Sequence, residues 1–514
     1  YVNPKHEQKV AEIARDLLPK NIFVTCSSEV LPEIREYERT STTAINAYLG
    51  PIVADYVSSL SNSLQNNSIH GPLQIMQSNG GIMSSRGILK KPATIVESGP
   101  AAGVIGAARI AGKTGYKNLI SLDLGGTTAK ASIIENGRLT KSSLMEVGGG
   151  QNFTSKMSMG KGHALKLPVI DVSEVGAGGG SLVEVDRYNR LFVGPKSAGA
   201  VPGPVAYDKG GDQTTLSDAL LILGYLNPMY LVGGEMLVNL EKASKVLQEN
   251  VAKPFDYSLS EAAYGIVEVA TVNMMAAVRS VSTNRGRDPR DFDLFAFGGT
   301  GPVLAAELAK QLGIKRVIIP QNPGLFSAFG LLHSSIEYDY VQTFLKPGVN
   351  LSSGELNQAF LEIEGKAITE LSEDGYKPDE ITMRRQADLQ YAGQAFELTV
   401  EVYKNQSIEE MIGVVGSARD GFRNDVTAYM FAKMRKGETV DYKSYGPLRE
   451  AIQQYLITSV KDISRIVTRS KSRDDNQKKK YSEMVETLIN EYDYNEYSAE
   501  EILTYAANNL WRDS

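Results

Sequence analysis

The sequence predicts an α/β fold in which strands and helices alternate through about residue 335. Two segments carry most of this prediction. Two short apolar runs around a Gly-Gly pair predict a β-hairpin over Ser121–Gly137, and an apolar strand followed by Gly-Gly and a helix occupies residues 294–312. Helical and strand patterns also alternate before and between these two segments.

The alternation begins at the N-terminal end of the chain. Apolar spacing predicts helices over Glu7–Leu18 and Thr42–Leu60, with a short strand at Asn21–Thr25 between them. After a glycine-punctuated stretch, a helix opens at Pro100. The Ser98-Gly99 turn before that helix predicts either free N–H groups for an anion or a tight helix–strand contact.

The predicted hairpin has a tip suited to phosphate. Asp123 ends the first strand, and Gly125, Gly126, Thr127 and Thr128 follow it. Glycines let the backbone approach a ligand and point N–H groups at it, and the threonine hydroxyls add donors. The Asp123 carboxylate could hold Mg²⁺ or orient a water. The alternative is a plain glycine turn between two core strands.

The region from 165 to 224 holds the densest glycine cluster, EVGAGGGSL through KGGDQTTLSDALLILG. Glycine and proline at this density predict ordered loops facing a ligand rather than regular structure, and a flexible linker is the alternative. A helix then begins after Thr215 or Ser217, with Asp218 in its first turn. Candidate polar groups of a cleft are Asp171 and Asp218, each of which could instead cap a turn or helix.

The later segments complete the α/β pattern and then depart from it. A long helix over Leu259–Ser282 reads as core, strand 294–297 and its helix follow, and a strand VIIP precedes the turn QNPGLFSAFGLL. Over residues 337–403, strand patterns flank a helix and predict a small α+β domain. From about residue 415 charged residues and Tyr dominate the composition, and the apolar spacing predicts helices.

Composition excludes several classes of function. The chain has 514 residues, a net charge of −6 and 42% hydrophobic residues, which argues for a globular protein of more than one domain and against a broad nucleic-acid-binding face. No apolar run reaches the roughly 18 residues of a membrane span. The single cysteine, Cys26, permits no intrachain disulfide and suggests the cytoplasm, and four histidines make a Cys/His zinc site improbable.

A set of motifs resembles the hydantoinase A/5-oxoprolinase family, which includes subunits of acetone and acetophenone carboxylases. In order along residues 1–403 they are EVLPEIREYERTSTTAINAYLGP, QSNGGIMS, ESGPAAGVIGAA, DLGGTT, VGAGGGS, GPKSAGAVPGPVAY, TTLSDALLILG, GRDPRDF, FAFGGTGP and NPGLFSAFGLL. The resemblance implies actin/sugar-kinase-like (ribonuclease H-like) ATPase lobes over 1–336 and part of a C-terminal α+β domain over 337–403.

The resemblance also implies a site for ATP and Mg²⁺. By position, the residues matching the phosphate hairpin are Asp123, Gly125, Gly126, Thr127 and Thr128, and those matching the adenosine turn are Gly298, Gly299 and Gly301. Asp123 would serve as the metal or water-orienting carboxylate. Arg285, Arg290 and Lys130 could neutralise phosphate, although solvated surface is the more common place for each.

Two departures from the family pattern are expected to matter. Family members open with a further glycine–threonine hairpin, which would lie before Tyr1, so the sequence as given is expected to be truncated at its N-terminus. Residues 415–514 instead resemble the C-terminal region of PrkA-type serine protein kinases, without that kinase's ATP-binding loop, and a join falls near 404–418.

The leading functional prediction is an ATP-dependent hydrolase subunit for hydantoin, 5-oxoproline or a similar cyclic amide. Phosphorylating a carbonyl oxygen turns a poor leaving group into a good one, and the protein supplies position and charge. The resemblance implies a hydantoinase B-like partner subunit and a small cyclic amide or ketone as substrate. The alternatives are a ketone carboxylase subunit and a catalytically silent fragment that keeps part of a nucleotide cleft.

Overall fold

A computed structural model describes residues 3–148, 162–346, 351–389 and 397–402. The chain divides into two compact units, 1–350 with 355–383 and 351–354 with 384–514. The first unit contains the whole of the central sheet. The helical tail predicted from residue 415 lies outside the described residues.

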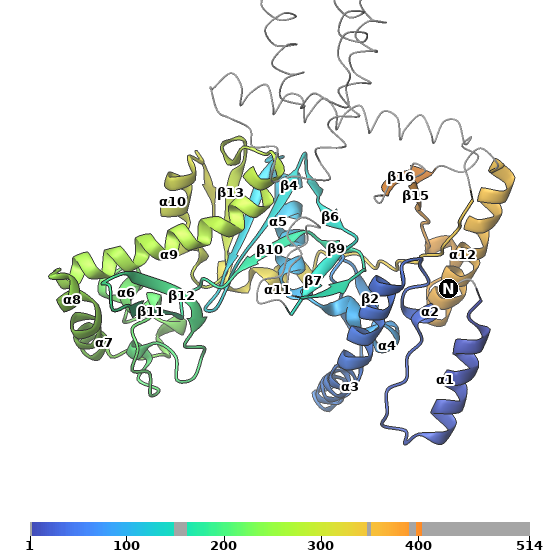
Figure 1. Ribbon diagram of the computed structural model, residues 1–514, viewed down its shortest axis with the longest axis horizontal. Helices are drawn as coiled ribbons and strands as arrows, with labels where there is room; N and C mark the ends of the chain where they lie inside the picture. The colour runs from blue at the N-terminus through green and yellow to red at the C-terminus, as the bar shows by residue number, and fades with distance from the viewer. Residues whose placement is uncertain (1–2, 149–161, 347–350, 390–396, 403–514) are drawn as a thin grey trace, which may run out of the picture. The chain divides into compact units, whose positions relative to one another are not determined.

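A six-stranded sheet forms the centre of the first unit (Figure 1). Its order is β10-β4-β3-β13-β14, and β5 pairs with β4. Strand β4 is antiparallel to both β10 and β3, whereas β13 is parallel to both β3 and β14. The strand bounds are β3 (Leu119–Leu124), β4 (Ala129–Glu135), β5 (Arg138–Leu139), β10 (Val172–Val175), β13 (Asp293–Phe297) and β14 (Val317–Ile318).

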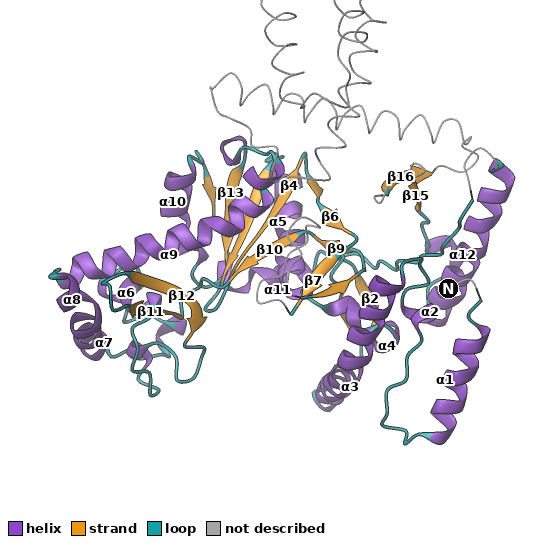
Figure 2. Ribbon diagram, in the orientation of Figure 1, coloured by secondary structure: helices purple, strands orange, loops and turns teal. Residues whose placement is uncertain are grey.

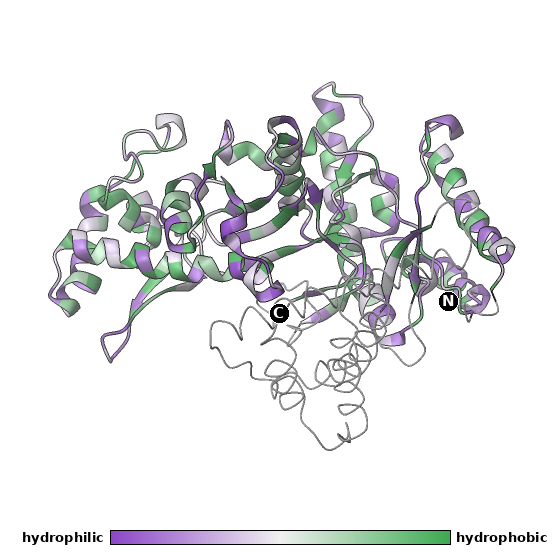
Figure 3. Cartoon of the chain, turned by 90° about the horizontal axis from the view of Figure 1, so that it is seen from above, coloured by the Kyte–Doolittle hydropathy of each residue, from purple (hydrophilic) through white to green (hydrophobic). Residues whose placement is uncertain are grey.

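Helices cover both faces of this sheet (Figure 2). One face packs with α5 (Ser98–Thr114) and α11 (Phe326–Leu331), and the other with α9 (Leu259–Val281) and α10 (Gly301–Leu312). Alternate residues of β3 serve the two faces: Leu119 contributes to the α5 side, and Ile120 and Leu122 contribute to the α9 side. The strands therefore carry apolar residues towards both faces, interrupted by a few polar ones. Figure 3 shows this mixture of hydrophobic and hydrophilic residues along the described chain. The predicted α/β class is confirmed.

The N-terminal part is helical, with α1 (Lys5–Leu17), α2 (Ser27–Val30), α3 (Glu36–Asn66) and α4 (Ser85–Lys90) around a hairpin of β1 (Gln74–Met76) and β2 (Ile82–Ser84). The strand predicted at Asn21–Thr25 does not form, and none of the described strands pairs with this segment. Its apolar residue Phe23 instead lies against α3, where a Cβ on Gly50 would come 2.3 Å from the ring. Helix α3 is also longer at both ends than Thr42–Leu60.

The glycine-dense region is more regular than predicted. It contains β8 (His163–Leu165), β9 (Val169–Ile170), β10, β11 (Ser181–Val185) and β12 (Leu191–Ser197). The glycines lie mainly in the connections, so the apolar residues between them remain free to form strands. Helix α6 (Leu216–Ile222) begins as predicted, capped by Thr215, with Asp218 completing a capping box. Two short strands precede this region, β6 (Lys141–Ser142) and β7 (Met145–Val147).

Three further elements complete the described chain. Helices α7 (Leu240–Leu247) and α8 (Lys253–Phe255) precede α9. The segment predicted as a turn, QNPGLFSAFGLL, contains helix α11, because its apolar residues pack on α5. After α12 (Ser353–Glu373), β15 (Arg385–Leu389) and β16 (Leu398–Val402) pair with each other, so both strands follow the helix rather than flanking it. Within the described ranges, none of the helices has the length and apolarity needed to cross a membrane.

Candidate nucleotide site

The β3–β4 hairpin ends in an open tip at Gly125–Thr128. The Gly125 amide donates to the Thr128 carbonyl at 3.1 Å, which closes the turn. Gly126 and Thr127 are exposed, and a Cβ at Gly125 or Gly126 would meet no other atom within 4 Å. Within the described part of the chain, the amides of Gly126, Thr127 and Thr128 have no hydrogen-bond acceptor. The tip therefore offers free N–H donors to an anion.

A glycine loop between β10 and β11 holds the other side of this tip. The Gly179 amide donates to the Gly125 carbonyl at 3.0 Å, and the Gly180 amide donates to the Gly126 carbonyl at 2.6 Å. A Cβ on Gly178 would lie 2.7 Å from the backbone of Gly126 and Thr127, so only glycine permits this contact. The loop thus fixes the tip by hydrogen bonds to the carbonyl groups of the tip, and it leaves the amide groups of the tip available to a ligand. Sequence reasoning marked this loop as ligand-facing but did not connect it to the hairpin.

The second glycine turn lies next to Asp123. Strand β13 pairs with β3 so that Phe297 stands opposite Asp123, and the chain then turns at Gly298. Gly298 has φ +84°, and a Cβ there would lie 2.6 Å from both Asp123 Oδ1 and the Leu124 carbonyl oxygen. Gly299 is exposed, and Gly301 begins α10. The structure therefore brings the two predicted segments together at the carboxyl edge of two parallel strands, where α/β sheets bind ligands.

Asp123 is a half-buried carboxylate at the centre of this edge. Burial raises its pKa, and the positive charge of Lys130 offsets only part of that effect. No group of three or more His, Cys, Asp or Glu side chains in the described ranges is arranged to hold a metal ion. Asp123 alone fits the way Mg²⁺ is bound with nucleotides, through one or two carboxylates, phosphate oxygens and waters.

Lys130 lies across the strand pair from Asp123, and Glu174 of β10 lies across from Lys130. Lys130 Nζ is 2.9 Å from Glu97 Oε2 and 3.6 Å from Glu174 Oε1, and only 19% of its side chain is exposed. Burial lowers the pKa of Lys130, but the carboxylates, Glu97 first, outweigh this and raise it overall. The expectation of a solvated lysine is wrong, because Lys130 lies between Asp123 and Glu174 on neighbouring strands and most of its side chain is covered.

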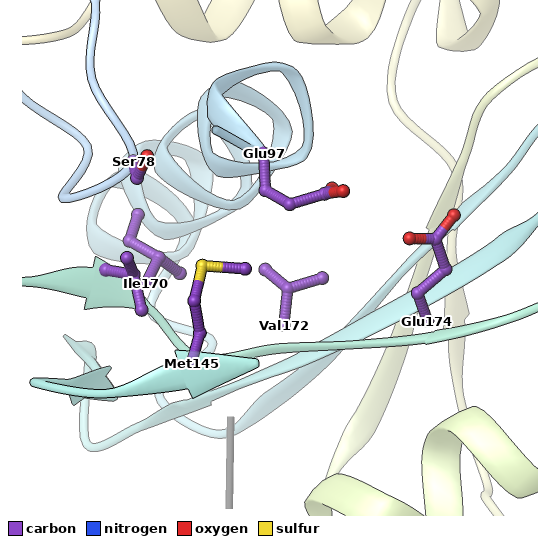
Figure 4. Close-up of a pocket in the computed structure, with 7 residues that line it drawn as sticks. Ser78, Glu97, Met145, Ile170, Val172 and Glu174 are labelled. Carbon is purple, nitrogen blue, oxygen red and sulfur yellow. The ribbon is translucent and has the colours of Figure 1, made fainter. Parts of the chain in front are cut away.

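Glu97 and Glu174 also line a small pocket beside this row (Figure 4). Glu97 stands just before α5 in a left-handed conformation with φ +62°. The remaining walls of the pocket come from Ser78, Met145, Val169, Ile170 and Val172. Sequence reasoning named neither glutamate, since only the register of the strands and the start of α5 bring them together.

The other candidate polar residues have structural partners. Asp218 is fully buried and accepts hydrogen bonds from the amides of Val205, Ala206 and Thr215, so it is a capping residue. Asp171 forms an ion pair with Arg285, one contact of which measures 3.1 Å. None of these groups lies on the Asp123 row of the sheet.

Replacing Arg285 by methionine is expected to destabilise the fold by about 3 kcal/mol, because it leaves a buried carboxylate without its counter-ion. The Asp171 side chain is only 4% exposed. Urea unfolding followed by circular dichroism would measure the loss. The matched control is Arg290→Met, since Arg290 and Asp288 are 64% and 38% exposed and the pair should contribute less than about 1 kcal/mol. Equal losses in both variants would contradict the expectation.

Three known sequence families match successive parts of the chain. The hydantoinase/oxoprolinase family matches residues 39–340, and the C-terminal domain of that family matches residues 349–419. The PrkA serine protein kinase C-terminal domain matches residues 390–505, nearly all of which lie outside the described residues. Both predicted resemblances are confirmed.

Individual relatives agree with the family match. An uncharacterised protein of Methanocaldococcus jannaschii is 38% identical over 92% of this chain and 70% of its own length. The alpha subunit of caprolactamase from Pseudomonas jessenii is 36% identical over 78% of this chain. In solved structures, ATP-dependent caprolactamase from that organism aligns with a TM-score of 0.65 at 32% identity, and nucleotide-free acetone carboxylase with 0.66 at 27% identity. Each alignment covers 83% of this chain.

This chain spans little more than half of these enzymes: 56% of the caprolactamase subunit and 60% of each solved chain. The structural matches confirm the predicted actin/sugar-kinase-like fold class for the part they cover. From the family match, the relatives and the fold together, the chain belongs to the hydantoinase/oxoprolinase family.

Proposed function

We propose that this chain binds Mg-ATP at the β3–β4 tip and serves as the nucleotide-binding subunit of a cyclic-amide hydrolase. The observation that carries the proposal is the open tip beside the half-buried Asp123, where the three amides of the tip have no acceptor among the residues that the structure describes. The ATP dependence of caprolactamase and acetone carboxylase supports the choice of nucleotide. The caprolactamase relative is named as a subunit, which supports a partner protein of the hydantoinase B type.

Each part of the site would have a separate task. The amides of Gly126, Thr127 and Thr128 and the threonine hydroxyls would donate to phosphate oxygens. Asp123 would hold Mg²⁺ through its waters or directly. The Gly298–Gly301 turn, with no side chain at Gly299, would leave room for adenosine. When bound, ATP supplies the phosphoryl group that activates a carbonyl oxygen of the substrate.

A ketone carboxylase subunit is the second candidate, because acetone carboxylase has the same fold at nearly the same TM-score as caprolactamase. ATP turnover measured with caprolactam, a hydantoin, 5-oxoproline, acetone or acetophenone, with the partner subunit present, separates the two reactions. Absence of Mg-ATP binding would instead favour the silent fragment. We also propose that the protein is located in the cytoplasm, because its single cysteine, Cys26, is buried and unpaired, as is usual in a reducing compartment.

Gly126→Ala is expected to weaken Mg-ATP binding at least tenfold and leave the melting temperature unchanged. Its Cβ would meet no protein atom and the residue does not need a positive φ, so only a ligand close to the backbone is obstructed. Isothermal titration calorimetry and thermal melting give the two readouts. Gly112→Ala is the matched control, since its Cβ also meets nothing, at an exposed position of α5. Unchanged affinity in Gly126→Ala would count against the tip as the phosphate site.

A further inference from the structure

The charged row across the sheet has a defined side. Glu174, Lys130 and Asp123 occupy opposed positions on β10, β4 and β3. Opposed residues of antiparallel strands share a face. Because Val172, Ile134 and Leu119 lie in the α5 core and are separated from the row by even numbers of residues, the row also faces α5. Glu97 reaches Lys130 from the start of that helix.

The adenosine turn leads to the opposite side of the sheet. Helix α10 follows Gly301, and its Leu304 and Leu308 pack in the core shared with α9. The tip at Gly126–Thr128 lies at the strand ends between the two sides. A nucleotide extending from the α10 turn past the tip would therefore bring its terminal phosphate toward the α5 side.

Lys130 is placed to meet that phosphate. It follows Thr128 by two residues, or about 7 Å along an extended strand, a span that the flexible four-carbon lysine stem can cover. Three carboxylates, Glu97, Glu174 and Asp123, act on its ammonium and keep it charged. Of the three cations singled out in the sequence, Arg285 and Arg290 are engaged with Asp171 and Asp288, and Lys130 alone lies on the row.

We propose that Lys130 binds the terminal phosphate of ATP, and that Glu97 and Glu174 are positioning residues that hold its ammonium on the α5 side of the sheet. The inference rests on the proposed nucleotide site and goes further by distinguishing ATP from ADP. On binding, the ammonium exchanges part of its contact with Glu97 for a γ-phosphate oxygen. ADP lacks that oxygen and gains nothing from Lys130.

The experiment compares the affinities of Lys130→Met for the magnesium complexes of a non-hydrolysable ATP analogue, adenylyl imidodiphosphate, and of ADP by calorimetry. The expected result is a loss of at least tenfold for the analogue and less than twofold for ADP. Lys242→Met is the matched control, because Lys242 forms an ion pair at 2.6 Å with Asp208 on an exposed surface. Both of its affinities should stay within twofold of those of the unmodified chain.

Removing Lys130 alone takes a positive charge from beside Glu97 and Glu174, so the second measurement uses a variant that also neutralises both glutamates, Lys130→Met with Glu97→Gln and Glu174→Gln. This variant should show the same loss of preference for the triphosphate. Of two single variants, Glu97→Gln should lower the affinity for the ATP analogue, and Glu97→Asp, which keeps the charge, should retain most of it. Equal losses for both nucleotides, or no loss for the analogue, would overturn the role of Lys130 alone. Failure of the unmodified chain to bind either nucleotide would overturn the proposed function, and this inference with it.

Discussion

Asp123→Asn is expected to lower ATP-dependent turnover by about 100-fold or more, or roughly 3 kcal/mol of transition-state stabilisation. Asparagine keeps the shape of the side chain, but it lacks the charge that would hold Mg²⁺ or orient a water beside the tip. The measurement is kcat with the partner subunit present and Mg-ATP saturating. A parallel titration with Mg²⁺ should show that the variant needs a higher Mg²⁺ concentration to reach half of its maximal turnover. Turnover within threefold of the unmodified enzyme would contradict a chemical role for Asp123.

The same substitution should leave the fold intact, which separates a lost function from a lost structure. Burial raises the pKa of Asp123, so the folded chain binds this proton more tightly than the unfolded chain does. The stabilisation linked to that proton is complete at low pH and is lost as pH rises through the folded pKa. At neutral pH the asparagine variant should therefore be as stable as the unmodified chain or slightly more stable. Urea unfolding at pH 4 and pH 7 measures this difference.

Gly330→Ala is expected to have the largest effect on stability, a loss of more than about 3 kcal/mol. A Cβ on Gly330 of α11 would lie 1.8 Å from the Ala102 carbonyl oxygen and 2.6 Å from its carbon. Both atoms belong to the backbone of α5, so no side chain can rotate away to make room. The two helices would have to separate. Urea unfolding, or the soluble yield if the variant does not fold, measures the outcome.

The matched control for this helix crossing is Gly324→Ala, since a Cβ at Gly324 meets no atom within 4 Å and its φ is not positive. Its stability should change by less than about 1 kcal/mol. If Gly330→Ala were equally mild, α5 and α11 would pack less closely than the structure has them. Because α5 begins next to Glu97, a shift of this helix should also weaken the contact with Lys130.

Local patterns in the sequence were sufficient for elements that depend on a few neighbouring residues. The β3–β4 hairpin follows from apolar runs around Gly125-Gly126, and the α6 cap from Thr215 with Asp218. The strand predicted at Asn21–Thr25 failed because an apolar run also suits a segment that packs one ring, Phe23, on a helix. In the glycine-dense region, counting glycines concealed the strands between them.

The candidate site could be predicted only in part, for a related reason. Asp123 and the two glycine turns carry recognisable local signals, and the structure places them side by side. Glu97, Lys130 and Glu174 come from three separate segments, and their meeting depends on strand register and on where α5 starts. A short-range pattern in a single sequence does not show how distant strands are aligned, so the sequence alone favoured an exposed position for Lys130.

The Gly178–Gly180 loop has a consequence for the order in which ligands arrive. It occupies the carbonyl oxygens of Gly125 and Gly126, whereas the amides of Gly126, Thr127 and Thr128 have no acceptor among the described residues, so these amides suit an anion better than a cation. A lone divalent cation would find the Asp123 carboxylate beside these amides, but the described residues hold no group of three or more His, Cys, Asp or Glu side chains arranged to bind it. We therefore expect Mg²⁺ to bind together with ATP, as its complex with the polyphosphate, and not to occupy the site before the nucleotide arrives.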